Sequence, residues 1–163
     1  MQKYCLDTNC FIEAWNKYYS PDFCKDYWNV LERLGNDGVF FITEMVKKEI
    51  DNKDDKLSSW LKNNSKFVKP ITEEVQLKLK EIYTKDESHK RLVDNTKDRS
   101  MADPWVIAHA IVENAIVVTK EPLVDNPESK KIKIPNVCNN MGIRWIDDFD
   151  FIRETHITFD CKV

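Results

Sequence analysis

The stretch that decides the fold covers residues 99–121 and reads "RSMADPWVIAHAIVENAIVVTKE". Its apolar residues recur with the spacing of a helix from about 101 to 114, and "AIVVT" then forms the continuous apolar run of a buried parallel strand. A helix that leads directly into such a strand is typical of a layered α/β protein. The stretch therefore predicts a central sheet that is covered by helices.

An aspartate lies near the start of this helix, in line with its apolar face. Counting from Asp103, Ile107 is at i+4 and Ile111 is at i+8, so helical spacing places the carboxylate in the row that meets the core. Two interpretations stay open at this point: Asp103 caps the helix together with Ser100 as the N-cap, or it belongs to a functional site. A helix N-terminus favours an ionised carboxylate, so we expect Asp103 to be charged.

The rest of the chain alternates between predicted strands and predicted helices. We expect strands at 4–6, 39–42 and 131–135, and a short strand after Gly142. A helix is expected from Ser20 to a stop at Gly35, and others begin after Thr43 and Thr72. Shorter helices are expected within 51–66 and at 147–153, and a polar loop at 85–99. This alternation predicts an α/β domain with a mostly parallel sheet.

The composition is that of an ordinary soluble protein. The chain has 163 residues, the length of one domain, and its 25 Lys and Arg against 28 Asp and Glu give a formal net charge of −3. This balance lacks the broad basic surface of a protein that wraps a nucleic-acid duplex, although it allows local basic patches. Five cysteines without a CxxC pair, and no apolar run of about 18 residues, predict a cytoplasmic protein without a membrane span. Only three glycines are present, which excludes a glycine-rich phosphate loop.

Four acidic residues occur where predicted strands end or where the following helices begin. In open parallel sheets, ligands bind outside the carboxyl ends of the strands. Asp7 follows the first strand, Glu49 lies on the helix after the second, and Glu121 follows "AIVVT". Each acid also has a plain structural interpretation: a turn at Asp7, a solvent-exposed position for Glu49 and Glu121, and a helix cap for Asp103.

A set of converging carboxylates would require a compensating cation, because neighbouring carboxylates repel one another and raise each other's pKa. Mg²⁺ and Mn²⁺ are hard ions that prefer oxygen ligands. A metal-bound water in such a site can cleave a phosphodiester bond. The histidines and cysteines lack the spacing of a zinc site, so they suggest no other metal.

In the order of its motifs, the chain resembles the PIN-domain family, which includes the VapC-type ribonuclease toxins of bacterial toxin–antitoxin modules. The family's first strand is similar to "CLDTNCFI", and its strand and helix with an inward-facing Glu are similar to "FFITEMVKKEI". Its central helix resembles "SMADPWVIAHAI", and its strand ending in Thr-x-Asp resembles "AIVVTKE". The resemblance implies a single PIN-like domain over residues 1–163, with three α/β/α layers and a mostly parallel central sheet.

The same resemblance implies an activity and a site. It implies a metal-dependent endoribonuclease, the toxin of a toxin–antitoxin module, with RNA as substrate and with a small antitoxin protein and a second copy of the chain as partners. The catalytic acids that would bind Mg²⁺ or Mn²⁺ are Asp7, Glu49, Asp103 and Glu121, supported by Asn9 and Thr119. Two features depart from the family: Glu121 replaces the usual Asp, and the segment 122–142 is longer than the usual ending.

Basic residues near these motifs offer a path for RNA phosphates or, equally, an ordinary charged surface: Lys47, Lys48, Lys120, Lys130, Lys131 and Lys133. Trp105 could stack on a base, but its place in the helix is more typical of the core or an interface. His109 lies away from the Asp103 row. Two other functions stay open. One is a catalytically silent PIN-like binding or scaffold protein, in which Glu121 spoils metal binding. The other is a phosphatase with Asp7 as nucleophile, which is disfavoured because Asn9 stands where the second acid would be.

Overall fold

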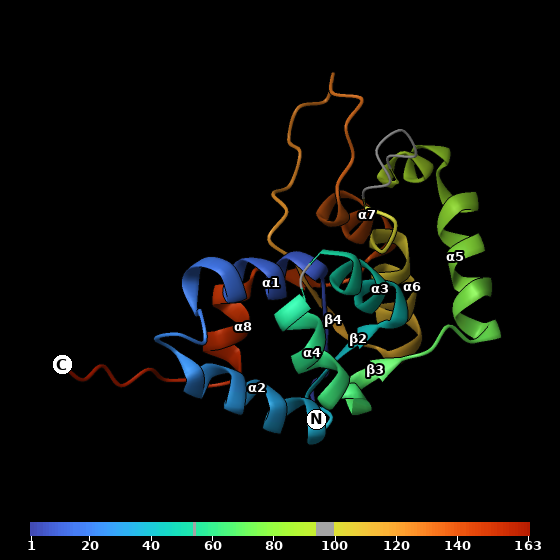
Figure 1. Ribbon diagram of the computed structural model, residues 1–163. Helices are drawn as coiled ribbons and strands as arrows, with labels where there is room; N and C mark the ends of the chain where they lie inside the picture. The colour runs from blue at the N-terminus through green and yellow to red at the C-terminus, as the bar shows by residue number, and fades with distance from the viewer. Residues whose placement is uncertain (54, 94–99) are drawn as a thin grey trace.

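The computed structural model describes residues 1–53, 55–93 and 100–163. Five strands form one sheet in the order β3-β2-β1-β4-β5, and every neighbouring pair is parallel. Helices pack on both sides of this sheet (Figure 1). The three-layer α/β/α arrangement with a parallel central sheet is therefore confirmed. The strands are β1 (Tyr4–Leu6), β2 (Phe40–Thr43), β3 (Val68–Lys69), β4 (Ile116–Val118) and β5 (Trp145–Ile146).

Several predicted helix starts are present with their capping side chains. The hydroxyl of Thr43 accepts a hydrogen bond from the Val46 amide at 3.1 Å, and Thr72 accepts one from the Val75 amide at 3.3 Å. The long helices are α2 (Lys25–Asn36), α3 (Glu44–Lys53), α4 (Asp55–Asn63), α5 (Glu73–Lys85) and α6 (Asp103–Glu113). The shorter ones are α1 (Thr8–Glu13), the π-helix η1 (Ala14–Tyr18), the 3₁₀ turns η2 (Ser65–Phe67) and η3 (Glu87–Leu92), α7 (Ile134–Met141) and α8 (Asp148–Glu154).

The register of the two central strands places the ends of β1 and β4 side by side. Leu6 pairs with Val118, and the Asp7 amide donates a hydrogen bond to the Val118 carbonyl at 2.9 Å. Both strands are fully buried, because helices cover the sheet on each face. The residues that follow the strands, Asp7 and Thr119, therefore meet at the carboxyl edge of the sheet.

The predicted helix from Ser20 is wrong at both ends. Residues 21–23 form a turn in which Phe23 is 71% exposed, and α2 begins only at Lys25. Gly35 lies inside α2 and does not stop it. A Cβ atom at Gly35 would lie 2.3 Å from Cδ1 of Phe67, so this glycine lets α2 approach the Phe67 ring.

The predicted strand at 131–135 is also wrong. The chain enters α7 at Ile134, and Pro135 lies in the first turn of this helix, where its missing amide proton is tolerated. Before α7, residues 122–133 form neither helix nor strand and project from the body as a loop, drawn in orange in Figure 1. Part of the predicted polar loop at 85–99 is the 3₁₀ turn η3, and residues 94–99 of that loop lie outside the described residues.

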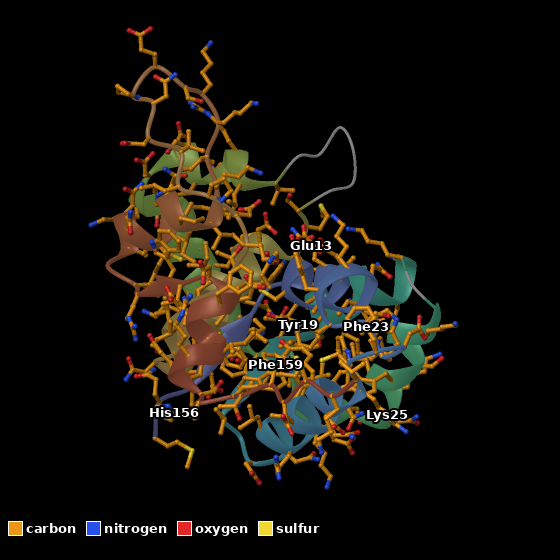
Figure 2. The ribbon with its side chains drawn as sticks, turned by 90° about the vertical axis from the view of Figure 1, so that its left-hand side faces the viewer. Glu13, Tyr19, Phe23, Lys25, His156 and Phe159 are labelled. Carbon is orange, nitrogen blue, oxygen red and sulfur yellow. The ribbon has the colours of Figure 1, made fainter. Side chains whose placement is uncertain are left out.

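The C-terminal segment packs against an early part of the chain. The Phe159 ring stacks on Tyr19, with ring centroids 5.0 Å apart and an interplanar angle of 10°, and Figure 2 shows the two side chains next to each other. Tyr27 on α2 adds a third ring, 6.0 Å from Phe159. The end of the chain is thereby attached beside α2. Among the described residues, no helix has the length and apolar character needed to cross a membrane.

Candidate functional site

Asp7 lies at the carboxyl edge of the sheet, directly after β1. It is the N-cap of α1 and is 2% exposed. Its Oδ1 accepts a hydrogen bond from the Thr8 amide at 2.7 Å, and its Oδ2 accepts one from the Thr119 hydroxyl at 3.1 Å. The direction of this carboxylate is therefore fixed by the two strands that end beside it. The predicted turn at Asp7 is the start of a helix.

Asp103 is the first residue of α6 and is 5% exposed. Ser100 is not the N-cap, because Ala102 occupies that position and makes no side-chain capping bond. Ser100 instead has a positive φ of 60°, and its carbonyl accepts a hydrogen bond from the Asp103 amide at 3.3 Å. The chain thus bends sharply just before α6 and turns the first carboxylate of the helix into the protein.

Burial raises the pKa of Asp103 well above its ordinary value, and Asp7, Glu121 and Glu49 add to this rise by charge repulsion. Burial and the neighbouring acids therefore act against the helix N-terminus, which favours the charged form of Asp103. The pKa of Asp7 is likewise raised to about 7, first by burial and then by Glu121, with a smaller contribution from Glu49. Hydrogen bonds from Thr8 and Thr119 oppose this rise.

Glu49 connects the segments that carry these two aspartates. Its Oε2 accepts a hydrogen bond from the Thr8 hydroxyl at 2.6 Å, and its Oε1 accepts one from the Ala102 amide at 3.1 Å. Thr8 follows Asp7 and Ala102 precedes Asp103, so Glu49 holds the two acids in position relative to each other. No role for Thr8 was predicted from the sequence, although it lies in the motif "CLDTNCFI".

Glu121 has both carboxylate oxygens engaged. Oε1 accepts from the Lys133 ammonium at 3.0 Å, and Oε2 accepts from the Ile134 amide, the first of α7, at 2.9 Å. The pKa of Lys133 is raised by this hydrogen bond, and Asp103 and Asp7 also raise it through their charges. Lys133 therefore lies within the electrostatic reach of three of the four acids. The role of Ile134 was missed because residues 131–135, which include the start of α7, were predicted to form a strand.

Within the described ranges, no three His, Cys, Asp or Glu side chains are arranged together as ready metal ligands. The structure does bring Asp7 and Asp103 together as buried oxygen donors whose charges repel. Mg²⁺ is usually held by one or two carboxylates and several waters, so this pair fits a largely hydrated ion and not a closed cage. Asn9 is half-buried in the first turn of α1, and its supporting role stays a prediction.

The basic residues named from the sequence fall into two groups. Lys120 is 13% exposed, forms an ion pair with Asp148 at 2.8 Å and lies over the Tyr18 ring, so it serves to join α8 to η1. Lys47 and Lys48 pair with acids of their own helix, α3. In contrast, Lys130 and Lys131 are exposed on the loop before α7. The surface available to a phosphate backbone is therefore concentrated on that loop.

The two remaining candidates on α6 belong to the interior. Trp105 is half-buried against the core, as expected. His109 is 1% exposed, and burial lowers its pKa to about 4, so it is neutral near pH 7. A cavity of about 590 Å³ lies at the other end of α6, where Asn114 and Ile116 are among its lining residues. None of the four acids lines this cavity, so the acid site and the cavity are separate features.

The fold is a layered α/β/α domain that carries acids at the carboxyl edge of its parallel sheet. A chain in the crystal structure of VapBC2 from Rickettsia felis bound to a DNA fragment from their promoter has this fold. The match has a TM-score of 0.52 and 23% sequence identity, and covers 90% of this chain and 98% of that chain. The resemblance to VapC-like PIN proteins is thus confirmed for the fold. Residues 4–159 match the family described as Domain of unknown function (DUF4411), and the chain belongs to this family. No curated protein matches it.

Proposed function

We propose that this protein is a Mg²⁺- or Mn²⁺-dependent endoribonuclease that hydrolyses RNA phosphodiester bonds. The observation that carries the proposal is the pair of buried carboxylates, Asp7 and Asp103, each with a pKa raised by burial and by neighbouring acids. Burying two repelling carboxylates is costly unless a cation compensates them. A bound divalent ion would supply that charge and would activate a water for attack on phosphorus.

The residues of this chain divide the work of the proposed site. Asp7 and Asp103 hold the ion, and Glu49 keeps them in place through Thr8 and Ala102. Thr119 orients Asp7 through its hydroxyl. Glu121 completes the acidic edge, and Asn9 supports it from α1.

The VapC-like fold supports the extension of this proposal to a toxin–antitoxin module. In this proposal the protein is a cytoplasmic toxin, its substrate is RNA, and its partners are a small antitoxin protein and a second copy of the chain. The structurally similar VapBC2 is a complex, which supports the presence of a protein partner. Growth arrest on expression, relieved by the Asp7→Asn variant, tests the toxin assignment independently of any purified activity.

The activity is tested with single-stranded RNA in Mn²⁺, in Mg²⁺ and in EDTA. We expect wild-type protein to cleave with either metal, and Asp7→Asn and Asp103→Asn to lose metal-dependent cleavage. The matched control is Asp37→Asn, which neutralises an exposed aspartate at the C-terminal end of α2. Cleavage that persists in EDTA, or that both site variants retain at the wild-type rate, contradicts the proposed site.

A second candidate is a catalytically silent PIN-like binding protein. It is favoured by Glu121, whose two oxygens are already occupied by Lys133 and Ile134. Calorimetric titration with Mn²⁺ separates the two candidates. Saturable binding that Asp7→Asn abolishes supports the nuclease, whereas the absence of saturable binding, both alone and with RNA, supports the silent protein.

A further inference from the structure

The loop of residues 122–133, here called the arm, is firmly attached at its base. Glu121 binds Lys133 and the first amide of α7, which joins the two ends of the arm. In the first turn of α7, the Asn136 side chain accepts a hydrogen bond from the Val124 amide at 3.2 Å and donates one to the Val124 carbonyl at 2.9 Å. The two ends of the arm are therefore held in place beside Glu121, and the arm projects beyond α7 (Figure 1).

A second segment, η3, is attached to the same helix. His89 is fully buried, with Nδ1 2.7 Å from the Ile82 carbonyl and Nε2 3.0 Å from Nδ2 of Asn140. A carbonyl only accepts hydrogen bonds, so Nδ1 donates and Nε2 accepts from the Asn140 amide. Asn136 and Asn140 are four residues apart, on one face of α7. The arm and η3 are thus the two walls of a groove whose floor is α7.

This groove has the chemistry of an anion site. A cavity of about 180 Å³ lies between the walls, and its cations are Arg91 from η3 and Lys130 and Lys131 from the arm. Hydroxyl and amide groups of Ser88, Asn126 and Asn140 also line it, and none of the described lining residues is an Asp or Glu. The described lining of this groove is therefore positively charged, whereas the chain as a whole has a formal net charge of −3.

We propose that the groove between the arm and η3 binds the phosphodiester backbone of the RNA strand next to the acid site. The inference rests on the proposed function, and it assigns this groove as the substrate-binding track of that site. The side chains are cations and hydrogen-bond donors, the groups that contact phosphates without reading sequence. The groove lies close to the acids along the chain, because Lys133, two residues after Lys131, binds Glu121.

An RNA strand suits this groove better than a protein partner does. Protein interfaces are enriched in aromatic and Met side chains at their centre and depleted in Lys. The groove has two lysines, one arginine and only two aliphatic side chains, Val124 and Ile132, among its described lining residues. A backbone with one negative charge on each nucleotide matches several separated cations at once.

The test is RNA binding without cleavage, measured by fluorescence anisotropy of labelled single-stranded RNA in EDTA over a series of salt concentrations. The test variant is Arg91→Gln/Lys130→Gln/Lys131→Gln. We expect weaker binding and a shallower dependence of the binding constant on salt, by about 0.7 in the log–log slope for each lost phosphate contact, or about 2 for three.

The matched control removes three exposed cations far from the groove: Lys25→Gln/Lys62→Gln/Lys66→Gln. Lys25 lies at the opposite end of the molecule from the arm in Figure 2, and α4 and η2 carry the other two. The control must keep the wild-type slope and both triple variants must keep the wild-type melting temperature. If the groove variant folds and binds RNA with the same affinity and slope as the control, the proposal is wrong.

Two further outcomes separate this inference from the proposed activity. If Mn²⁺ binding and cleavage are both absent but the groove variant still loses RNA affinity, the nuclease proposal fails and the groove stands as an RNA site. Duplex DNA and a candidate protein partner are titrated in parallel. A groove variant that loses either of these ligands while RNA binding stays unchanged overturns the assignment to RNA.

Discussion

Replacing Asp7 with Asn should stabilise the metal-free protein at alkaline pH, although it removes a hydrogen bond. The pKa of Asp7 is raised in the folded state from 3.8 to about 7, chiefly by burial and then by Glu121. Between these two values the folded state binds more protons than the unfolded state, so the free energy of unfolding falls as the pH rises. The stability contributed by protonated Asp7 is complete below pH 3.8 and is lost as the pH passes through about 7.

The size of the effect follows from the shift. The rise in the pKa of Asp7 from 3.8 to about 7 is a rise of about 3 pKa units. At 1.36 kcal/mol for each unit, ionised Asp7 lowers the free energy of unfolding by roughly 4 kcal/mol above pH 7. Asn cannot ionise and therefore escapes this cost. Its single oxygen can satisfy Thr8 or Thr119 but not both, which costs about 1 kcal/mol. The net expectation for Asp7→Asn is a gain of about 3 kcal/mol at pH 8 and a small loss at pH 4.

The assay is urea unfolding in EDTA at pH 4, 6 and 8, followed by circular dichroism. Asp86→Asn is the control, because hydrogen bonds from Ser88 lower the pKa of this exposed carboxyl, so any stability it contributes is present above its unfolded pKa. As the pH rises, the change in the free energy of unfolding caused by Asp86→Asn must therefore have the opposite trend to that caused by Asp7→Asn. If Asp7→Asn is as destabilising at pH 8 as at pH 4, the pKa of Asp7 is not raised by burial and charge repulsion in the folded protein.

Three further substitutions test the packing, the capping and the arm. Gly35→Ala should destabilise the protein by about 1–3 kcal/mol in urea unfolding, because the added methyl meets the Phe67 ring; a gain in stability contradicts the close approach of α2. Thr72→Ala should cost about 1 kcal/mol in the same assay, since it removes the cap of α5, and Thr84→Ala near the end of that helix is its control. Glu121→Gln should speed amide hydrogen exchange throughout the arm, whereas Glu128→Gln should not; equal exchange in both variants argues against the attachment through Lys133.

The order of the elements could be predicted from the sequence because their signals are local. The apolar run of β4 and the helical spacing before it identify α6 and the central strand from adjacent residues. The same holds for helix starts such as Thr43, whose hydroxyl reaches an amide three residues away. Local signals were insufficient for short elements. The six-residue helix α1 was not predicted, and the start of α7 was predicted as a strand.

The four acids and a supporting role for Thr119 could be named before the structure was known, but the individual hydrogen bonds of the acids could not. Glu49 accepts from Ala102, 53 residues away, and the Thr119 hydroxyl reaches Asp7 across 112 residues. Only the parallel register of β1 and β4 decides that these groups meet. The pairing of Glu121 with Lys133 depends on where the arm meets α7. The predicted strand at 131–135 gave no indication of this pairing.

The sequence alone therefore determined the α/β class, the mostly parallel sheet and the position of four acids at the ends of predicted strands or the starts of helices. Helical spacing, apolar runs and their order along the chain can be recognised from neighbouring residues. The tertiary structure decided the burial of Asp7 and Asp103 and the charges that surround them. Asp103 heads a helix, a position that by itself favours a charged carboxylate, yet its pKa is raised because the folded chain buries it beside Asp7, Glu121 and Glu49. Burial and charge repulsion depend on contacts between distant segments, and these exist only once the chain has folded.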